Sequence, residues 1–172
     1  MLVVALFGVV LAGCGGSSSD KKANEAYADG VCSAVASWTQ EIKDIATDFS
    51  SGISRASLQT KIDQAQSATK KLVNEVKAVP APDTDEGQAA KQQLNQLTDD
   101  VTTTVDGAKS ALAQVPADAS TTTIITAVGA LAPQVTNLVN EARSAIGTLK
   151  DAGGSLADAF KSTDSCKSLN PT

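Results

Sequence analysis

Catalysis at neutral pH needs side chains that can hold or move a proton, and this sequence offers few of them. It contains no histidine, which removes the most frequent general base and the most frequent transition-metal ligand together. No serine lies in a Gly-x-Ser-x-Gly nucleophile motif, and the Glu-x-x-His motif of di-iron bundles needs the missing histidine. Gly153-Gly154 lacks the glycine fingerprint of a nucleotide-binding loop. The sequence therefore predicts a protein that is not an enzyme and that has no cofactor.

Two groups of carboxylates have the residue types for metal binding or acid–base chemistry. The run from Asp83 to Glu86 lacks the ligand register of an EF-hand loop. Asp83 followed by Glu86 instead resembles a capping box, and carboxylates at a helix start complement the helix dipole. Asp99 and Asp100 are adjacent, so their side chains diverge on a helix and cannot act as a pair. Both groups are interpreted as helix ends and helix surface, with no metal site.

The remaining side chains with chemistry of their own are three cysteines, Cys14, Cys32 and Cys166. Cys14 follows an apolar run that extends from Leu2 to Leu11, about half the length that a membrane-spanning helix needs. A short apolar run that ends in small residues is typical of a signal peptide, although no Lys or Arg precedes this one. Together these features predict export across a membrane.

The segment Leu11-Ala12-Gly13-Cys14 closely resembles the lipobox of bacterial lipoproteins. The resemblance implies that a diacylglycerol is attached to the Cys14 sulfur and that residues 1–13 are removed as the signal peptide. Residues 14–23, which begin Cys-Gly-Gly-Ser-Ser-Ser, would then be a lipidated flexible tether, and residues 24–172 would be the folded domain. The implied location is the extracytoplasmic side of the cell membrane, held by the lipid.

If Cys14 carries the lipid, then Cys32 and Cys166 are left as an even pair in an oxidising compartment, where disulfides persist. We therefore expect a Cys32–Cys166 disulfide, with two free thiols as the alternative. A bridge that closes so long a loop stabilises by about 4 to 5 kcal/mol in the chain-entropy model. A thiol count on the unfolded, unreduced protein separates the two.

The elements that position these residues are helices, because apolar side chains recur at steps of three and four and no long alternating run appears. Four helices are expected, over residues 24–49, 57–79 and 84–115, and from Ser120 or Thr121 to about residue 149. Ser57 is the expected N-cap of the second helix. Pro133 lies inside the fourth, where the apolar stripe keeps its phase, so a kink and not a break is expected. Gly153 and Gly154 should end or bend that helix.

The predicted fold is all-α: an antiparallel up-down four-helix bundle with a short C-terminal helix around Leu156 and Phe160. The tail from Ser162 is expected to be a loop. In this topology Cys32 near the start of the first helix and Cys166 beyond the last one meet at the same end, which the tether would place nearest the membrane.

Composition narrows the range of partners. The net charge is −5 and aromatic residues make up 3% of the chain, which argues against nucleic acid, since its binding depends on clustered cations and stacking aromatics. The single tryptophan, Trp38, and the single tyrosine, Tyr27, fall on the apolar stripe of the first helix, where core packing is the first interpretation and ligand contact the second.

Two functions remain open from the sequence. The first is a non-catalytic structural or protein-interaction role in the cell envelope, with another envelope protein as partner. The alternative is a binding module for an apolar or lipid-like small ligand in the bundle core, because bundles place ligand sites between their helices.

Overall fold

The computed structural model describes residues 17–47 and 54–169, without the side chains of residues 17, 128, 131 and 132. This part of the chain is all-α and contains no strand. Its helices, in chain order, are α1 (Ser17–Thr47), α2 (Arg55–Ala78), α3 (Asp85–Ala113), α4 (Thr121–Asp151), α5 (Gly154–Ser162) and α6 (Asp164–Lys167).

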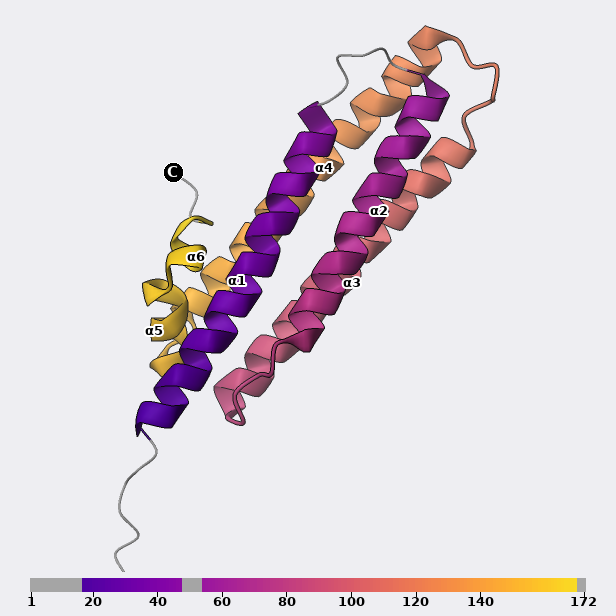
Figure 1. Cartoon of the computed structure of the whole chain (residues 1–172). Coiled ribbons are helices and arrows are strands. Elements are labelled where there is room, and N and C mark those ends of the chain that lie inside the picture. Colours follow the sequence, from indigo (N-terminus) through magenta and orange to yellow (C-terminus); the bar gives the residue numbers. More distant parts are fainter. Residues whose placement is uncertain (1–16, 48–53, 170–172) are drawn as a thin grey trace, which may run out of the picture.

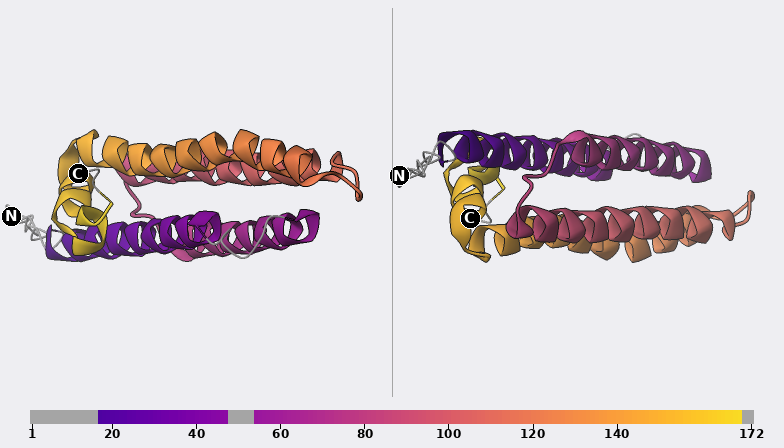
Figure 2. Two further views of the ribbon diagram at one scale, coloured as in Figure 1. Left: turned by 90° about the horizontal axis from the view of Figure 1, so that it is seen from above. Right: turned by 90° about the horizontal axis from the view of Figure 1, so that it is seen from below.

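The four long helices lie side by side and run alternately in opposite directions (Figure 1). They contain 31, 24, 29 and 31 residues, which makes them roughly 36 to 46 Å long. Seen along the other axis they form two layers, α1 with α2 and α3 with α4 (Figure 2). The start of α1 and the α2–α3 connection lie at one end, which we call proximal, and the α3–α4 connection lies at the distal end.

The predicted apolar stripes become the buried faces of the helices. Every described side chain of these stripes is buried or partly buried. The fully buried members are Tyr27, Val31, Val35, Trp38 and Ile42 in α1, Leu58, Ile62, Thr69, Leu72 and Val76 in α2, Ala90, Leu94, Leu97, Val101, Val105 and Leu112 in α3, and Ile124, Leu138, Ala142, Ile146 and Leu149 in α4. The stripe positions 49, 128 and 131 lie outside the described side chains.

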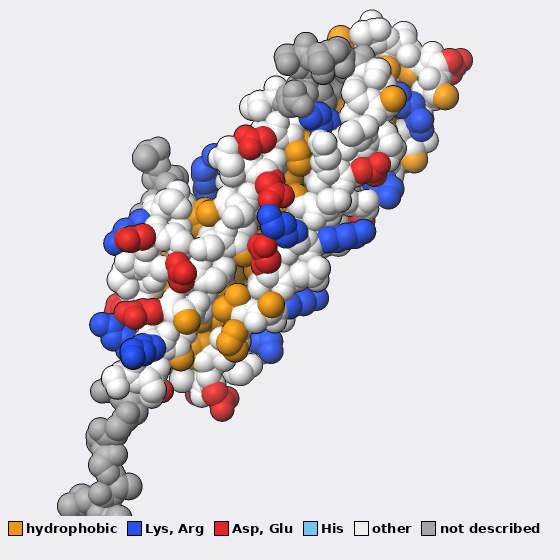
Figure 3. Space-filling view, in the orientation of Figure 1, with side chains coloured by type: hydrophobic (Ala, Val, Ile, Leu, Met, Phe, Trp, Pro, Cys, Tyr) orange, Lys and Arg blue, Asp and Glu red, His pale blue; other side chains and the backbone are white. Residues whose placement is uncertain are grey.

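The surface is correspondingly polar. In Figure 3, acidic and basic side chains are scattered over the face that α1 and α2 present, with small apolar patches between them. The only large hydrophobic side chain that is strongly exposed among the described residues is Ile125, at 51%.

The start of α1 differs from the expectation. The helix begins at Ser17 and not near Asn24, so the prediction of a flexible tether up to residue 23 is wrong for residues 17–23. Asp20 in the first turn complements the helix dipole, and Lys21 forms an i,i+4 ion pair with Glu25, with 3.7 Å between Nζ and Oε1. The first turns of α1 are exposed, so local preference and not core burial makes this segment helical.

The N-caps of α2 and α3 also differ from the prediction. Ser54, and not Ser57, caps α2: its Oγ accepts a hydrogen bond from the Ser57 backbone N–H at 3.0 Å, and the Ser57 Oγ accepts one from the Ser54 N–H at 2.9 Å. In α3 the cap is Thr84, whose Oγ1 accepts from the Gly87 N–H at 3.1 Å. The capping box predicted for Asp83 is therefore wrong by one position. Helix α4 begins at Thr121, one of the two starts expected, and Ser120 is its N-cap.

The chain beyond α4 is more ordered than expected. Gly153 and Gly154, with φ of 80° and 76°, separate α4 from α5, and these left-handed angles favour glycine. The predicted short helix is α5, but the tail from Ser162 is not a loop throughout, because residues 164–167 form α6. The physical reason is burial: Cys166 and Leu169 are fully covered, which orders a segment whose sequence alone reads as polar.

Helix α5 stands between α1 and α4 at the proximal end. It packs against both of them, whereas α1 and α4 touch each other directly over a smaller interface, and Figure 2 shows α5 bridging the two layers there. Leu156, Ala159 and Phe160 enter the main core from α5, and the Phe160 ring meets the Tyr27 ring edge-on at a centroid distance of 6.2 Å. The last helices therefore complete the proximal core.

Candidate functional site

The buried residues form two separate clusters along the bundle axis. The larger one fills the proximal and middle parts and contains the aromatic side chains Tyr27, Trp38 and Phe160. The smaller one lies toward the distal end and consists of Leu58, Ile62, Leu112 and Ile124. The core is thus interrupted, and the interruption is where a ligand site can form.

A cavity of about 310 Å³ lies at this interruption. All four long helices contribute to its wall. The described lining residues are Ile42, Ile45, Ala46, Leu58, Lys61, Ile62, Ala65, Thr104, Val105, Ala108, Gln134, Val135, Thr136 and Leu138. The volume is at the lower end of the range of about 300 to 1,000 Å³ that small-ligand pockets occupy.

The position of α5 explains why the cavity is distal. At the proximal end α5 fills the space between α1 and α4. In the distal half no described helix takes that place, so side chains alone occupy the space between the layers there. Two of these are the small Ala65 and Ala108, which do not reach far enough to close it.

The chemistry of the wall is aliphatic. No described lining residue is aromatic, and Lys61 is the only charged one. The Thr104 hydroxyl is already used, because it donates to the Asp100 carbonyl oxygen at 2.9 Å. Ala46 of α1 and Gln134 and Thr136 of α4 are exposed, which indicates that the cavity opens to solvent between α1 and α4. The site therefore suits an apolar group that enters from that side.

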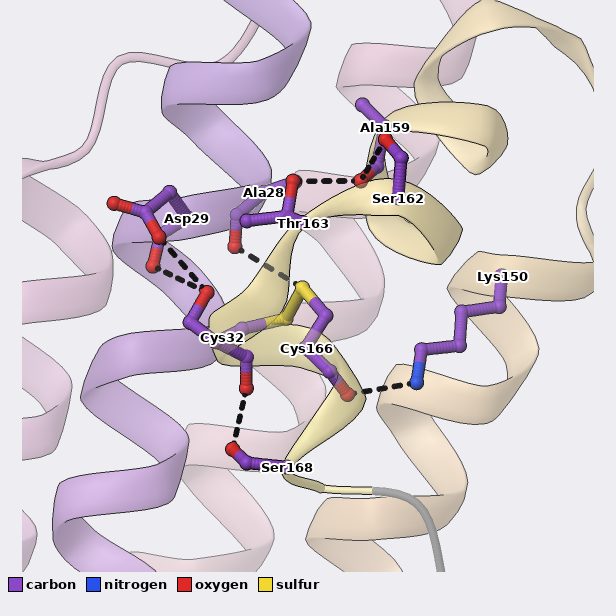
Figure 4. Close-up of a disulfide and its surroundings, with 10 residues drawn as sticks. Ala28, Asp29, Cys32, Lys150, Ala159, Ser162, Thr163, Cys166 and Ser168 are labelled. Atoms are coloured by element: carbon purple, nitrogen blue, oxygen red, sulfur yellow. Dashed lines mark hydrogen bonds between the residues drawn. A yellow bond between two sulfur atoms is a disulfide. The ribbon is translucent and has the colours of Figure 1, made fainter.

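The predicted disulfide is present. Cys32 of α1 and Cys166 of α6 are joined across a sequence separation of 134 residues. Cys32 lies at the middle of α1 and not near its start, because the helix begins earlier than expected and α6 lies along its flank (Figure 4). The predicted meeting point at the very end of the bundle is therefore wrong, although the pairing is right.

Several hydrogen bonds hold the C-terminal helices around this bridge. The Lys150 ammonium donates to the Cys166 carbonyl oxygen at 2.8 Å, and the Ser165 hydroxyl donates to the Asp29 carboxylate at 2.9 Å. Partial burial lowers the pKa of Lys150, and the nearby Asp151 opposes this effect. The bridge is thus part of a packed joint, with both sulfurs buried, and its role is structural.

The single tyrosine and tryptophan lie in the core, as expected. Burial raises the pKa of the Tyr27 phenol to about 12. The Trp38 indole N–H donates to the Thr69 hydroxyl at 3.3 Å in a buried contact. Neither ring lines the cavity, so the alternative interpretation of these rings as ligand contacts has no support at this site.

The remaining predictions concern the lipid site, metal sites and membrane-spanning helices. Cys14, the proposed lipid attachment residue, lies outside the described residues. Residues 17–47 and 54–169 hold no cluster of three or more potential metal ligands of the His, Cys, Asp and Glu types. Within the same ranges, every helix is too short or too polar to span a bilayer.

The sequence left an apolar ligand site in the bundle core open as an alternative, but it did not show where a cavity would lie. The sequence pattern assigned the lining residues to apolar stripes or to helix surface. Such an assignment gives the direction of a side chain, but it does not show whether side chains from the opposite helix fill the space in front of it. The available signal was the pair of alanines, Ala65 and Ala108, at core-facing positions of the distal half.

Comparisons with protein families, with curated proteins and with solved structures find no match for this chain.

Proposed function

We propose that this protein is a non-catalytic, lipid-anchored binding protein on the extracytoplasmic side of a cell membrane, and that its ligand is apolar. The observation that carries the proposal is the aliphatic cavity between the four long helices. A cavity lined by aliphatic side chains favours an apolar ligand, because binding there removes the apolar surface of both from water. The likeness of residues 11–14 to a lipobox supports the anchor, and the Cys32–Cys166 disulfide fits an oxidising compartment.

This order of preference reverses the one drawn from sequence, where an envelope interaction came first. The reversal rests on volume and wall chemistry, neither of which the sequence pattern contains.

The anchor and the cavity would be far apart in the working molecule. Ile42, in the cavity wall, lies roughly 38 Å along α1 from Ser17, at 1.5 Å per residue. A lipid on Cys14 would hold the proximal end near the membrane. The ligand would therefore be held away from the bilayer surface, where a soluble or distal partner can reach it.

Native mass spectrometry of the lipoprotein tests the proposal. The protein is extracted from its host membrane with a styrene–maleic acid copolymer, so that no detergent occupies the cavity. We expect an apolar molecule to be retained by the wild type and by Ala111→Leu, whose added bulk lies on an exposed position of α3, and to be lost from Ala108→Leu, which fills the cavity. Absence of any retained molecule, together with no rise in Tm on adding apolar compounds, would count against the proposal.

A second candidate function is contact with another envelope protein. Ile125, 51% exposed near the distal start of α4, is the strongly exposed large hydrophobic side chain among the described residues. A single such residue is common on protein surfaces, so it gives the position to vary in a test and is not itself evidence of a contact. Crosslinking in intact cells tests this role: wild type should capture a defined partner that Ile125→Ser loses, and capture by neither or by both equally would contradict it.

A further inference from the structure

The dimensions of the cavity limit what can enter it. Its volume of about 310 Å³ is about twice that of a cavity of 150 Å³ that accepts benzene. If a methylene group takes roughly the 30 Å³ of a water molecule, about ten of them fill the space. Two chains side by side would need twice that volume over the same depth, so a diacyl lipid does not fit.

The length of the wall agrees with the volume. In α2 the lining extends from Leu58 to Ala65, and in α3 from Thr104 to Ala108. At 1.5 Å per residue these stretches are roughly 10 Å and 6 Å long. One leaflet of a bilayer core is about 15 Å thick, so the cavity is shallower than a full phospholipid chain. Any longer chain would leave its remainder outside.

The wall also lacks the groups that would recognise a flat or polar ligand. There is no aromatic face for stacking among the described lining residues, and the Thr104 hydroxyl already donates to its own helix. Polar side chains such as Gln134 lie where the wall is exposed. An apolar chain can therefore be buried while a polar group at its end stays in water at the opening between α1 and α4.

We propose that the cavity binds one unbranched alkyl chain of a single-chain amphiphile, to a depth of about ten carbons, and leaves the head group in solvent. This inference rests on the proposed function and sharpens it to a ligand class. Free fatty acids and monoacyl lipids share this chemistry, because both present one chain and one polar head.

Calorimetric titration of the full lipoprotein in phosphatidylcholine nanodiscs tests the ligand class, with empty nanodiscs as the blank. The probes are straight-chain fatty acids from hexanoate to tetradecanoate, decanol, lysophosphatidylcholine with a decanoyl chain, and the compact adamantane carboxylate. Affinity should rise about fourfold for each added methylene up to about decanoate and then level off. Decanol should bind within about threefold of decanoate, since each methylene and not the head provides the affinity.

Matched variants place the effect in the cavity. Ala108→Leu should weaken decanoate by at least about tenfold and move the plateau to shorter chains, because two or three methylene volumes are lost. Ala111→Leu should leave the whole series unchanged. Comparison of the lysolipid with decanoate identifies the natural source: equal affinity admits both, and a preference selects one.

The outcomes separate the inference from the proposed function. Three results would each overturn the single-chain assignment while leaving an apolar site. They are an affinity that keeps rising up to tetradecanoate, binding of decanol tenfold weaker than that of decanoate, and binding of adamantane carboxylate as tight as that of decanoate. Binding that Ala108→Leu does not change would overturn the location. If no probe binds, the proposed function fails as well.

Discussion

The buried hydrogen bond between Trp38 and Thr69 is the clearest polar contact inside the core. The two side chains are 2% and 3% exposed, so water cannot replace either partner if one is removed. A buried donor without an acceptor is destabilising. The pair therefore favours the one alignment of α1 against α2 in which the indole N–H reaches the Thr69 hydroxyl.

Replacing Thr69 by valine should lower the free energy of unfolding by about 1 to 3 kcal/mol, because the Trp38 N–H is left without an acceptor. Urea unfolding followed by the fluorescence of Trp38, the single tryptophan, measures this directly. The matched control is Thr103→Val in α3, at an exposed position, which should change stability by less than about 0.5 kcal/mol. Equal effects of the two changes would show that the indole contact adds nothing.

Tyr27 makes the protein sensitive to high pH. Burial raises the pKa of its phenol to about 12, from 10.0 in the unfolded chain. The folded state therefore keeps a proton that the unfolded state loses, so this residue's contribution to stability is complete below pH 10 and is lost as the pH rises toward 12.

Absorbance titration of the tyrosinate should accordingly give a midpoint near pH 12 for the native protein, against about pH 10 in urea. Tyr27→Phe should remove the part of the stability loss at high pH that comes from ionisation of the Tyr27 phenol. The stability loss that remains should come from the lysines, which also lose protons in this pH range. A native midpoint near 10 would mean that Tyr27 is not buried.

At the scale of the elements, the disulfide fastens α6, and with it α5, to the middle of α1. A bridge across a separation of 134 residues contributes about 5 kcal/mol in the chain-entropy model. The contacts of α5 with α1 and α4 add to the stability of this region, since they lie at the proximal end, beside the disulfide.

The double change Cys32→Ala and Cys166→Ala should therefore lower the free energy of unfolding by up to about 5 kcal/mol. It should also raise amide hydrogen exchange in α5 and α6 more than in α2 and α3. Wild type in reductant should behave like the double variant. Unchanged exchange in α5 and α6 would show that packing alone holds them.

Two glycines in α3 have opposite roles. A Cβ on Gly87 would lie 2.1 Å from the Pro82 carbonyl oxygen, whereas a Cβ on Gly107 would meet nothing within 4 Å. Gly87 thus permits the close approach of the α2–α3 connection to the first turn of α3, while Gly107 only weakens the helix.

We expect Gly87→Ala to destabilise the protein by about 1 to 3 kcal/mol and Gly107→Ala to stabilise it by about 0.5 to 1 kcal/mol. Thermal unfolding of both variants beside wild type gives the sign. A stabilising Gly87→Ala would mean that the connection does not pack as described.

Much of this fold could be predicted from the sequence, because helix periodicity reports directly on which side chains are buried. Val31, Val35 and Trp38 are examples in α1. The disulfide followed from counting cysteines once Cys14 was assigned to a lipid. The ends of the helices were less predictable: Ser54 and Ser57 are both good caps, and only the backbone decides between them.

What could not be predicted depends on how the helices meet. The order in the tail comes from Cys166 and Leu169, which are buried in the main core although the tail has no apolar pattern of its own. The cavity lies in the half of the bundle that α5 does not fill, where the small Ala65 and Ala108 form part of its wall. Both are properties of the assembled layers, so no local pattern contains them.

At the scale of the whole molecule, the proposed anchor gives the rod a direction. With a lipid on Cys14, each buried methylene adds about 0.8 kcal/mol to membrane binding, and the proximal end of the bundle would face the bilayer. The first turns of α1, which are helical and exposed, would then act as a short stiff spacer.

Cys14→Ser should release the protein from the membrane fraction and abolish incorporation of labelled palmitate, because the serine oxygen does not replace the acceptor sulfur. Cell fractionation with immunoblotting measures the first effect and autoradiography the second. Cys32→Ser, which alters a different cysteine, should retain the label. If Cys14→Ser still incorporates labelled palmitate, the lipid is attached to another residue and the assignment of Cys14 is wrong.

The joint between α1 and the C-terminal helices also constrains the order of folding. Tyr27 and Cys32 of α1 contact Phe160 and Cys166, which follow them by more than a hundred residues. During synthesis these contacts cannot form until the segment around Cys166 has emerged. The proximal part of the core is therefore completed last, after the C-terminal helices have been made.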